Sequence, residues 1–230
     1  DDISGIELPW ELVRAGRKTE IECFSERKVY SVRPRREALE KGARILGVRW
    51  VDTWKNGKVR SRLVCQDFNP EKGKKCDEMF AATPPLVVSR WLVSLAASQG
   101  VDGPGRNQLM ALDFSKAFLY GDVQREIYIE LPDEDGRKNA GNSVGLLSKS
   151  MYGLRDAPQV WQRVVESMLR ERGFRKVACT QCTYYHPGME MYVVAHVDDF
   201  LVLGARSDLD NLVKGLKQDG YECTHDLLGN

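Results

Sequence analysis

Two adjacent aspartates interrupt a run of residues that otherwise has the composition of a buried β-hairpin. The run extends from Met191 to Leu203 and is hydrophobic except at its centre, His-Val-Asp198-Asp199. Adjacent carboxylates repel each other, and burial makes each charge costly unless a cation lies nearby. A divalent cation would relieve this repulsion, because Mg²⁺ takes oxygen ligands from one or two carboxylates. A plain polar turn is the alternative interpretation, since Asp is common in turns.

A third aspartate stands at the end of another apolar run. Residues 109–112 read Leu-Met-Ala-Leu, Asp113 follows, and residues 115–120 have the pattern of a short helical turn. Asp113 is therefore a candidate helix N-cap. If this strand instead lies beside the hairpin, the carboxylates of Asp113, Asp198 and Asp199 converge. Three converging carboxylates are what two metal ions about 3.5–4 Å apart need for in-line phosphoryl displacement.

The rest of the chain alternates strands with helices. Asn56-Gly57 between two β-rich runs is a strong hairpin signal, and the tip and second arm are basic, with Lys55, Lys58, Arg60 and Arg62. We predict helices over residues 8–27, 86–98, 158–172 and 207–218, the last with Ser207 as N-cap. Strands are expected over residues 29–32, 108–113, 127–131, 144–148, 184–186, 191–196 and 200–203. Because several connections are hairpins, the pattern predicts an α+β fold with a mainly antiparallel sheet and helices on one face.

The net charge of +1 hides an uneven distribution. Residues 14–75 hold 18 Lys and Arg against 8 Asp and Glu. This asymmetry favours a polyanionic partner for the basic part, although a solvated basic surface would have the same composition. No run of about 18 apolar residues occurs, so we expect no membrane-spanning segment.

The six cysteines are scattered along a chain that is long enough to fold without disulfides, so a reducing compartment is expected. Cys179 and Cys182 form a single CxxC. The three histidines supply no second pair at ligand spacing, which argues against a zinc site. Two ordinary strand cysteines and a redox pair remain as interpretations.

Several short motifs occur together in a specific order. LDFSKAFLYGD (112–122) with IYIELP (127–132) matches L-D-V-x-x-A-F-L-x-G-D…V-Y-M-x-x-P, and KSMYGLRDAP (149–158) with Trp161 matches K-S-L-Y-G-L-K-Q-A-P-x-x-W. HVDD (196–199) matches Y-V-D-D. RLV (62–64) with Phe68, and Arg90 with LAA (95–97), match A-R-L-V-x-x-x-F and R-x-L-x-x-L-A-A. Each motif alone is weak, but the ordered set, from about residue 44 to the end, closely resembles the reverse transcriptases of copia-type LTR retrotransposons.

The resemblance implies a right-hand polymerase with a ferredoxin-like palm sheet, and it assigns roles by position. Asp113, Asp198 and Asp199 would be the catalytic carboxylates and, with the carbonyl of Phe114, the ligands of two Mg²⁺ ions, which Mn²⁺ could replace. The nucleotide-binding set would be Lys58, Arg62, Phe114, Ala117, Phe118, Tyr152 and Gly153. Within it, Phe118 would be the steric gate beneath the sugar and Arg62 would contact the triphosphate. The residues near the nucleic acid would be His196, Pro158 and Trp161. For two of these residues a plainer interpretation also stands, a surface arginine for Arg62 and a core tryptophan for Trp161.

The family order of segments implies a domain layout. Residues 1–43 would form a lead-in to the fingers, 44–107 the fingers, and 108–230 the palm, interleaved with fingers near 133–160. The chain ends where the family continues toward the primer grip, so we expect the thumb, connection and ribonuclease H regions to lie outside it. His196 stands in place of the usual Tyr before V-D-D, which bears on primer contacts and fidelity.

The activity implied is RNA-directed and DNA-directed DNA synthesis from dNTPs on a primed RNA or DNA template. The implied context is a Pol polyprotein with integrase, thumb and ribonuclease H, acting in DNA integration. The implied location is intracellular, in a cytoplasmic virus-like particle or the nucleus. One alternative is a catalytically inactive nucleic-acid-binding remnant, against which the intact carboxylates argue. Another is an unrelated two-metal nuclease, which would not require the segments of Phe118 and Tyr152.

Overall fold

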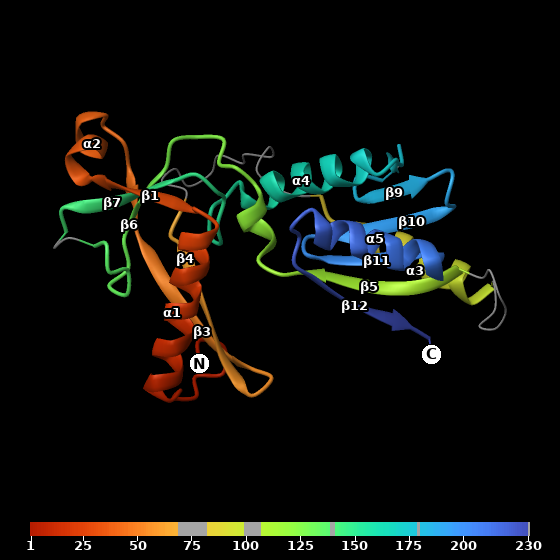
Figure 1. Cartoon of the computed structure of the whole chain (residues 1–230), viewed down its shortest axis with the longest axis horizontal. Coiled ribbons are helices and arrows are strands. Elements are labelled where there is room, and N and C mark those ends of the chain that lie inside the picture. Colours follow the sequence, from red (N-terminus) through yellow and green to blue (C-terminus); the bar gives the residue numbers. More distant parts are fainter. Residues whose placement is uncertain (69–81, 99–106, 139–140, 179, 230) are drawn as a thin grey trace. The chain divides into compact units, whose positions relative to one another are not determined.

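The computed structural model describes residues 1–68, 82–98, 107–138, 141–178 and 180–229, and the chain divides into two compact units (Figure 1). Unit 1 consists of Asp1–Met79 and Phe118–Val160, and unit 2 of Phe80–Ala117 and Trp161–Asn230. Among the helices of the described ranges, none combines the length and the apolar character that crossing a bilayer requires.

Unit 1 contains helix α1 (Trp10–Glu26), the short helix α2 (Arg35–Glu40) and two sheets. The larger sheet has the strand order β1 (Tyr30–Pro34), β7 (Ser143–Leu147), β6 (Tyr128–Glu130), β2 (Ile45–Leu46). Its pairs are antiparallel except β2 with β6, which is parallel. The core of the unit contains fully buried side chains from α1, from both sheets and from the connecting segments, among them Phe24, Leu63, Leu119, Ile129 and Met151.

The second sheet of unit 1 is the predicted Asn-Gly hairpin. Strands β3 (Val48–Lys55) and β4 (Lys58–Cys65) are joined by Asn56 and Gly57 alone. Both loop residues have positive φ, 52° and 75°, which is the requirement of a type I′ turn. The register therefore follows from the sequence, with Lys55 opposite Lys58 and Val51 opposite Arg62.

Unit 2 contains a six-stranded sheet in which every pair is antiparallel. Its order is β12 (Cys223–Leu228), β5 (Asn107–Phe114), β11 (Asp199–Ala205), β10 (Met191–His196), β9 (Thr183–His186), β8 (Arg175–Lys176). The helices are α3 (Leu86–Ser98), α5 (Arg206–Gln218) and α4 (Ala157–Glu171), which begins in unit 1. The 3₁₀ turn η2 (Ala117–Tyr120) spans the boundary between the units in the sequence. The mixed α+β class and the antiparallel sheet are confirmed.

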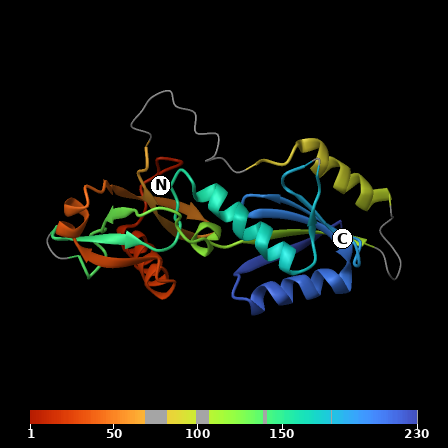
Figure 2. The same cartoon turned by 90° about the horizontal axis from the view of Figure 1, so that it is seen from above.

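The prediction that the helices cover one face of this sheet is wrong. Leu92 of α3 packs in a cluster with Leu109, Val194 and Leu203, whereas the ring of Trp161 in α4 contacts Phe114. Leu109 and Phe114 are five positions apart on β5, so they lie on opposite faces. Figure 2 shows α3 and α5 on opposite sides of the sheet. The physical reason is the continuous apolar run 109–112, because a strand that is apolar on both faces must be covered on both.

Two smaller expectations also differ from the structure. Helix α5 begins at Arg206, with Ala205 as N-cap and no side-chain cap hydrogen bond, so Ser207 is not the cap. Residues 223–228 form a strand that the sequence did not predict, and residues 35–40 form a helix directly after Pro34. Cys179 of the CxxC lies outside the described residues, whereas Cys182 is buried and reduced, as are Cys65 and Cys223.

Candidate active site

The three aspartates lie at one end of the sheet in unit 2. Asp113 is the penultimate residue of β5, Asp199 is the first of β11, and the register pairs them directly. Asp198 precedes Asp199 in the two-residue loop of the β10–β11 hairpin. Residues paired across an antiparallel ladder project to the same face, with Cβ atoms about 4.5–5.5 Å apart. Asp113 is thus in a strand, and the alternative N-cap interpretation does not hold.

The hairpin loop is held in a strained conformation. Val197, its first residue, has a φ of 55°, which is unusual for a β-branched side chain and costs of order 1–3 kcal/mol. Two hydrogen bonds fix the loop carbonyls. The backbone N–H of Phe114 donates to the Asp198 carbonyl at 3.0 Å, and the Trp161 indole Nε1 donates to the Val197 carbonyl at 2.6 Å. The carboxylates are therefore positioned by β5 on one side and by α4 on the other.

Aromatic side chains support this loop from the opposite face of the sheet. Phe114 is 1% exposed, and its ring contacts those of Trp161 at 5.3 Å, Phe200 at 4.9 Å and Tyr221 at 6.1 Å between centroids. Trp161 is also 1% exposed, so core packing is the interpretation that the structure shows for it. Pro158 is half-buried in the first turn of α4.

Asp113, Asp198 and Asp199 have the donor chemistry of a divalent-metal site, but their side chains are not gathered into one. Within the described ranges, no group of three or more His, Cys, Asp or Glu side chains is arranged to hold a metal ion. The backbone nevertheless places Asp113 opposite Asp199, and like charges directly opposite each other on one face are destabilising. Carboxylate oxygens are the ligands that Mg²⁺ prefers, so the residues fit such an ion. His196 is exposed and pairs with Asp199 in the ladder.

Four of the residues predicted to bind nucleotide come together in unit 1. The guanidinium of Arg62 lies 5.3 Å from the centre of the Tyr152 ring, and the ring of Phe118 is 5.2 Å from that of Tyr152. Gly153 has a φ of 84°, and a Cβ there would lie 2.0 Å from the carbonyl oxygen of Cys65. Only glycine allows this approach, which brings the loop after Met151 against the end of β4. Ala117 is buried, and Lys58 is exposed at the hairpin tip.

The basic residues of the hairpin lie on one face. Because side chains alternate along a strand, the register of β3 and β4 gives one face all the hairpin cations, Arg49, Lys55, Lys58, Arg60 and Arg62. Asp52 is on the other face. The basic composition was evident from the sequence, but the segregation follows only when the register is known.

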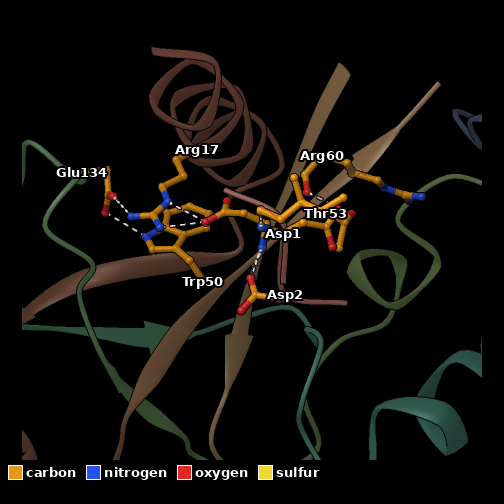
Figure 3. A network of polar contacts seen from close by, with 9 residues as sticks. Asp1, Asp2, Arg17, Trp50, Thr53, Arg60 and Glu134 are labelled. Atoms are coloured by element: carbon orange, nitrogen blue, oxygen red, sulfur yellow. Dashed lines mark hydrogen bonds and ion pairs between the residues drawn. The ribbon is translucent and has the colours of Figure 1, made fainter. Parts of the chain in front are cut away.

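Arg17 fastens the opposite face of the hairpin, and nothing in the sequence pointed to it (Figure 3). Its guanidinium donates to Asp52 at 2.7 Å and to Glu134 at 2.7 Å, and it lies 5.3 Å from the Trp50 ring centre. The Trp50 indole donates to the second oxygen of Glu134 at 2.8 Å. Burial alone would raise the pKa of Glu134, but the hydrogen bonds from Arg17 and Trp50 outweigh it and lower the pKa.

Comparison with known proteins places the chain in a family. A family model described as "Reverse transcriptase (RNA-dependent DNA polymerase)" matches residues 34–222. The Pol polyprotein of transposon TNT 1-94 from Nicotiana tabacum is 31% identical over 186 residues, which are 77% of this chain and 14% of that protein. The Pol polyprotein of transposon RE1 from Arabidopsis thaliana is 29% identical over 198 residues, 80% of this chain and 13% of that protein. The Ty1-BR Gag-Pol polyprotein of Saccharomyces cerevisiae is 25% identical over 131 residues, 51% of this chain and 7% of that protein.

A solved structure, the foamy viral protease–reverse transcriptase in complex with double-stranded DNA, covers 91% of this chain and 30% of its own, with 12% identity and a TM-score of 0.47. The chain spans about one seventh of the length of these two plant transposon polyproteins, 14% and 13%. The match over residues 34–222 and the transposon relatives confirm the resemblance found in the motifs. The chain belongs to the reverse transcriptase (RNA-dependent DNA polymerase) family, with copia-type retrotransposon Pol polyproteins among its relatives.

Proposed function

We propose that this chain is the nucleotide-adding part of a DNA polymerase that copies RNA and DNA templates. The observation that carries the proposal is the register of β5 with β11, which sets Asp113 opposite Asp199 with Asp198 adjacent in the loop. In a member of the reverse transcriptase family, three acids at one exposed end of a sheet fit the catalytic carboxylates. Like charges opposite each other destabilise a strand pair, so the pairing of Asp113 with Asp199 costs the sheet some stability.

The carboxylates of Asp113, Asp198 and Asp199, with the Phe114 carbonyl, would hold two Mg²⁺ ions or Mn²⁺ in their place. When bound, these ions would lower the pKa of the primer 3′-hydroxyl and neutralise the leaving pyrophosphate. The protein's part is to hold the backbone that carries these acids in place. The hydrogen bonds from Phe114 and Trp161 do this by fixing the strained loop between β10 and β11.

The residues of unit 1 supply nucleotide binding. Arg62 would donate to the triphosphate, and its Nε is buried without a hydrogen-bond partner among the described residues. Lys58 adds positive charge from the same face of the hairpin. Phe118, backed by the Tyr152 ring, would exclude a 2′-hydroxyl from the sugar site. Base pairing with the template selects the base, so the protein recognises shape rather than sequence.

In this proposal unit 1 corresponds to the fingers and unit 2 to the palm. The helix α3, within the stretch expected to be fingers, packs on the sheet of unit 2. The partners proposed are a primed RNA or DNA template, dNTPs and the other parts of a Pol polyprotein, and the proposed setting is a virus-like particle in the cytoplasm or the nucleus.

Primer extension tests the proposal. The chain, with any sequence that flanks it in its source polypeptide, is given a primed RNA or DNA template, dNTPs and Mg²⁺ or Mn²⁺. The wild type is expected to extend the primer, and Asp199→Asn is expected to abolish extension. Asp210→Asn, which removes an exposed charge on α5, serves as the control and should extend normally. Template binding without extension by the wild type would instead support the inactive remnant.

A further inference from the structure

A buried aspartate joins three segments of unit 1 close to the predicted nucleotide-binding loop. Asp67 lies two residues beyond the end of β4, and its side chain is 2% exposed. A carboxylate buried to this degree requires positive partners or several hydrogen bonds. The neighbours of Asp67 therefore show which parts of the chain depend on it.

Two arginines from separate segments meet the Asp67 carboxylate. Nη2 of Arg125 donates to Oδ2 at 2.5 Å, and the backbone N–H of Arg155 donates to the same oxygen at 3.3 Å. The Arg155 side chain approaches it at 3.4 Å. Arg125 also donates to Asp156 through Nε at 3.3 Å, so it bridges two carboxylates. The result is a cluster of two positive and two negative charges.

The loop 152–156, which contains Arg155, also contacts β4 through its backbone. The N–H of Cys65 donates to the carbonyl of Tyr152 at 2.8 Å, and Gly153 lies directly against Cys65. One end of the loop 152–156 is thus attached to β4 by main-chain contacts and the other by the Asp67 cluster. Two attachment points define both the position and the orientation of the loop, whereas one would allow it to pivot.

We propose that Asp67 is a positioning residue of the nucleotide pocket, which holds the loop 152–156 so that Tyr152 meets Arg62 and Phe118. This inference rests on the proposed function, because it gives the loop a role in binding dNTP. The geometry behind it is the pair of ring contacts of Tyr152, 5.3 Å to the Arg62 guanidinium and 5.2 Å to the Phe118 ring. The partners of Asp67 among the described residues are Arg125 and Arg155, so its effect would be exerted through the loop that contains Arg155.

The energetics of buried ion pairs favour positioning over stability as the role of this cluster. Desolvation offsets most of the Coulomb attraction of such pairs, so they contribute little net stability, while their fixed hydrogen-bond geometry restricts conformation. Burial alone would raise the pKa of Asp67, but the hydrogen bond from the Arg155 backbone and the charge of Arg125 outweigh it and lower the pKa. The carboxylate is therefore charged at neutral pH, as the cluster requires.

The test compares Asp67→Asn with Asp133→Asn in the full chain. Both remove one carboxylate charge from an ion pair of unit 1, but the Asp133 side chain is 91% exposed. Hydrogen exchange followed by mass spectrometry is measured over unit 1. Asp67→Asn is expected to speed exchange in residues 150–157 about tenfold and to leave exchange in α1 and β7 unchanged. Asp133→Asn is expected to leave exchange in all of these segments unchanged.

Steady-state primer extension supplies the second measurement. Asp67→Asn is expected to raise the KM for dNTP about tenfold, while kcat and primer–template affinity change less than about twofold. Asp67→Glu keeps the charge and is expected to return the KM most of the way to the wild-type value. A residue needed only for stability would lower the active fraction and kcat without this split.

The outcomes separate the two proposals. Faster exchange throughout unit 1, or unchanged exchange in residues 150–157, would overturn the inference. A mobile loop with an unchanged KM would overturn it as well. If the wild type does not extend primers at all, the proposed function fails, and the exchange result still decides whether Asp67 holds the loop.

Discussion

Charged residues serve different ends in the two units. In unit 1, ion pairs join segments that are distant in sequence, such as Arg17 with Glu134 and Arg125 with Asp67. In unit 2, the described ion pairs such as Lys176–Glu166 and Arg206–Asp210 lie at the surface, and an apolar sheet sets the positions of the important acids. Unit 1 therefore places its proposed ligand-binding groups by electrostatic cross-links, whereas unit 2 places its proposed catalytic acids by strand register.

Within unit 1, the side chain of Phe118 gives the largest expected effect and tests the proposal that this unit recognises the nucleotide. Phe118→Val removes most of the ring that packs on Tyr152 and would open space for a 2′-hydroxyl. We expect the preference for dNTP over rNTP to fall about a hundredfold, in line with the discrimination that a shape-complementary pocket achieves. Primer extension with each nucleotide measures it. Unchanged selectivity would mean that the gate lies elsewhere.

Arg62 tests whether the basic face of the hairpin serves the nucleotide or the template. Arg62→Ala removes a charge-assisted contact worth about 1.5–3 kcal/mol, so the KM for dNTP should rise about tenfold or more. Arg60→Ala, on the same face of the hairpin, is the control and should leave that KM nearly unchanged. Loss of template affinity with normal nucleotide kinetics would assign Arg62 to the nucleic-acid backbone instead.

A smaller effect is expected in unit 2, from the hydrogen bond by which Trp161 supports the loop between β10 and β11. Trp161→Phe preserves an aromatic contact with Phe114 but removes the donor to the Val197 carbonyl, leaving that carbonyl unsatisfied at about 1–3 kcal/mol. We expect kcat to fall several-fold with the KM for dNTP nearly constant. Trp91→Phe, on the exposed side of α3, is the control. A normal kcat would show that register alone holds the strained loop.

Features set by local sequence could be predicted, whereas contacts between distant segments could not. The hairpin at Asn56-Gly57 and the strand that carries Asp113 were predictable, because each depends on local backbone preference and hydrophobic run length. The Asp67 cluster and the Arg17 network were not, since they join residues as far apart as 88 and 117 positions. Strand β12 was missed because its residues 224–226, Thr-His-Asp, are exposed and polar. The coverage of both sheet faces was implicit in the apolar run 109–112.

The smallest effect concerns pH and should distinguish the two units directly. Burial alone would raise the pKa of Asp67, Glu134 and Asp135, but hydrogen bonds, including those from arginines, outweigh it, and the pKa of each is lowered. A carboxyl whose pKa is lowered by folding stabilises the fold fully above its unfolded pKa of about 4, and this contribution is lost as pH falls through the folded value. Hydrogen exchange between pH 7 and pH 3 should therefore show unit 1 opening before unit 2. Glu134→Gln should weaken that dependence. If both units opened at the same pH, ion pairs would not be more important to unit 1 than to unit 2.

The claim that strand register assembles the catalytic carboxylates is tested most directly by metal binding. Free Mn²⁺ is followed by electron paramagnetic resonance in the presence of primer–template with a dideoxy-terminated primer and a matching dNTP, so that no chemistry occurs. Asp113→Asn and Asp199→Asn are each expected to weaken Mn²⁺ binding at least about tenfold, because each removes a charged oxygen ligand. Asp210→Asn should bind as the wild type does. Indistinguishable binding curves for Asp113→Asn, Asp199→Asn and the wild type would contradict the account.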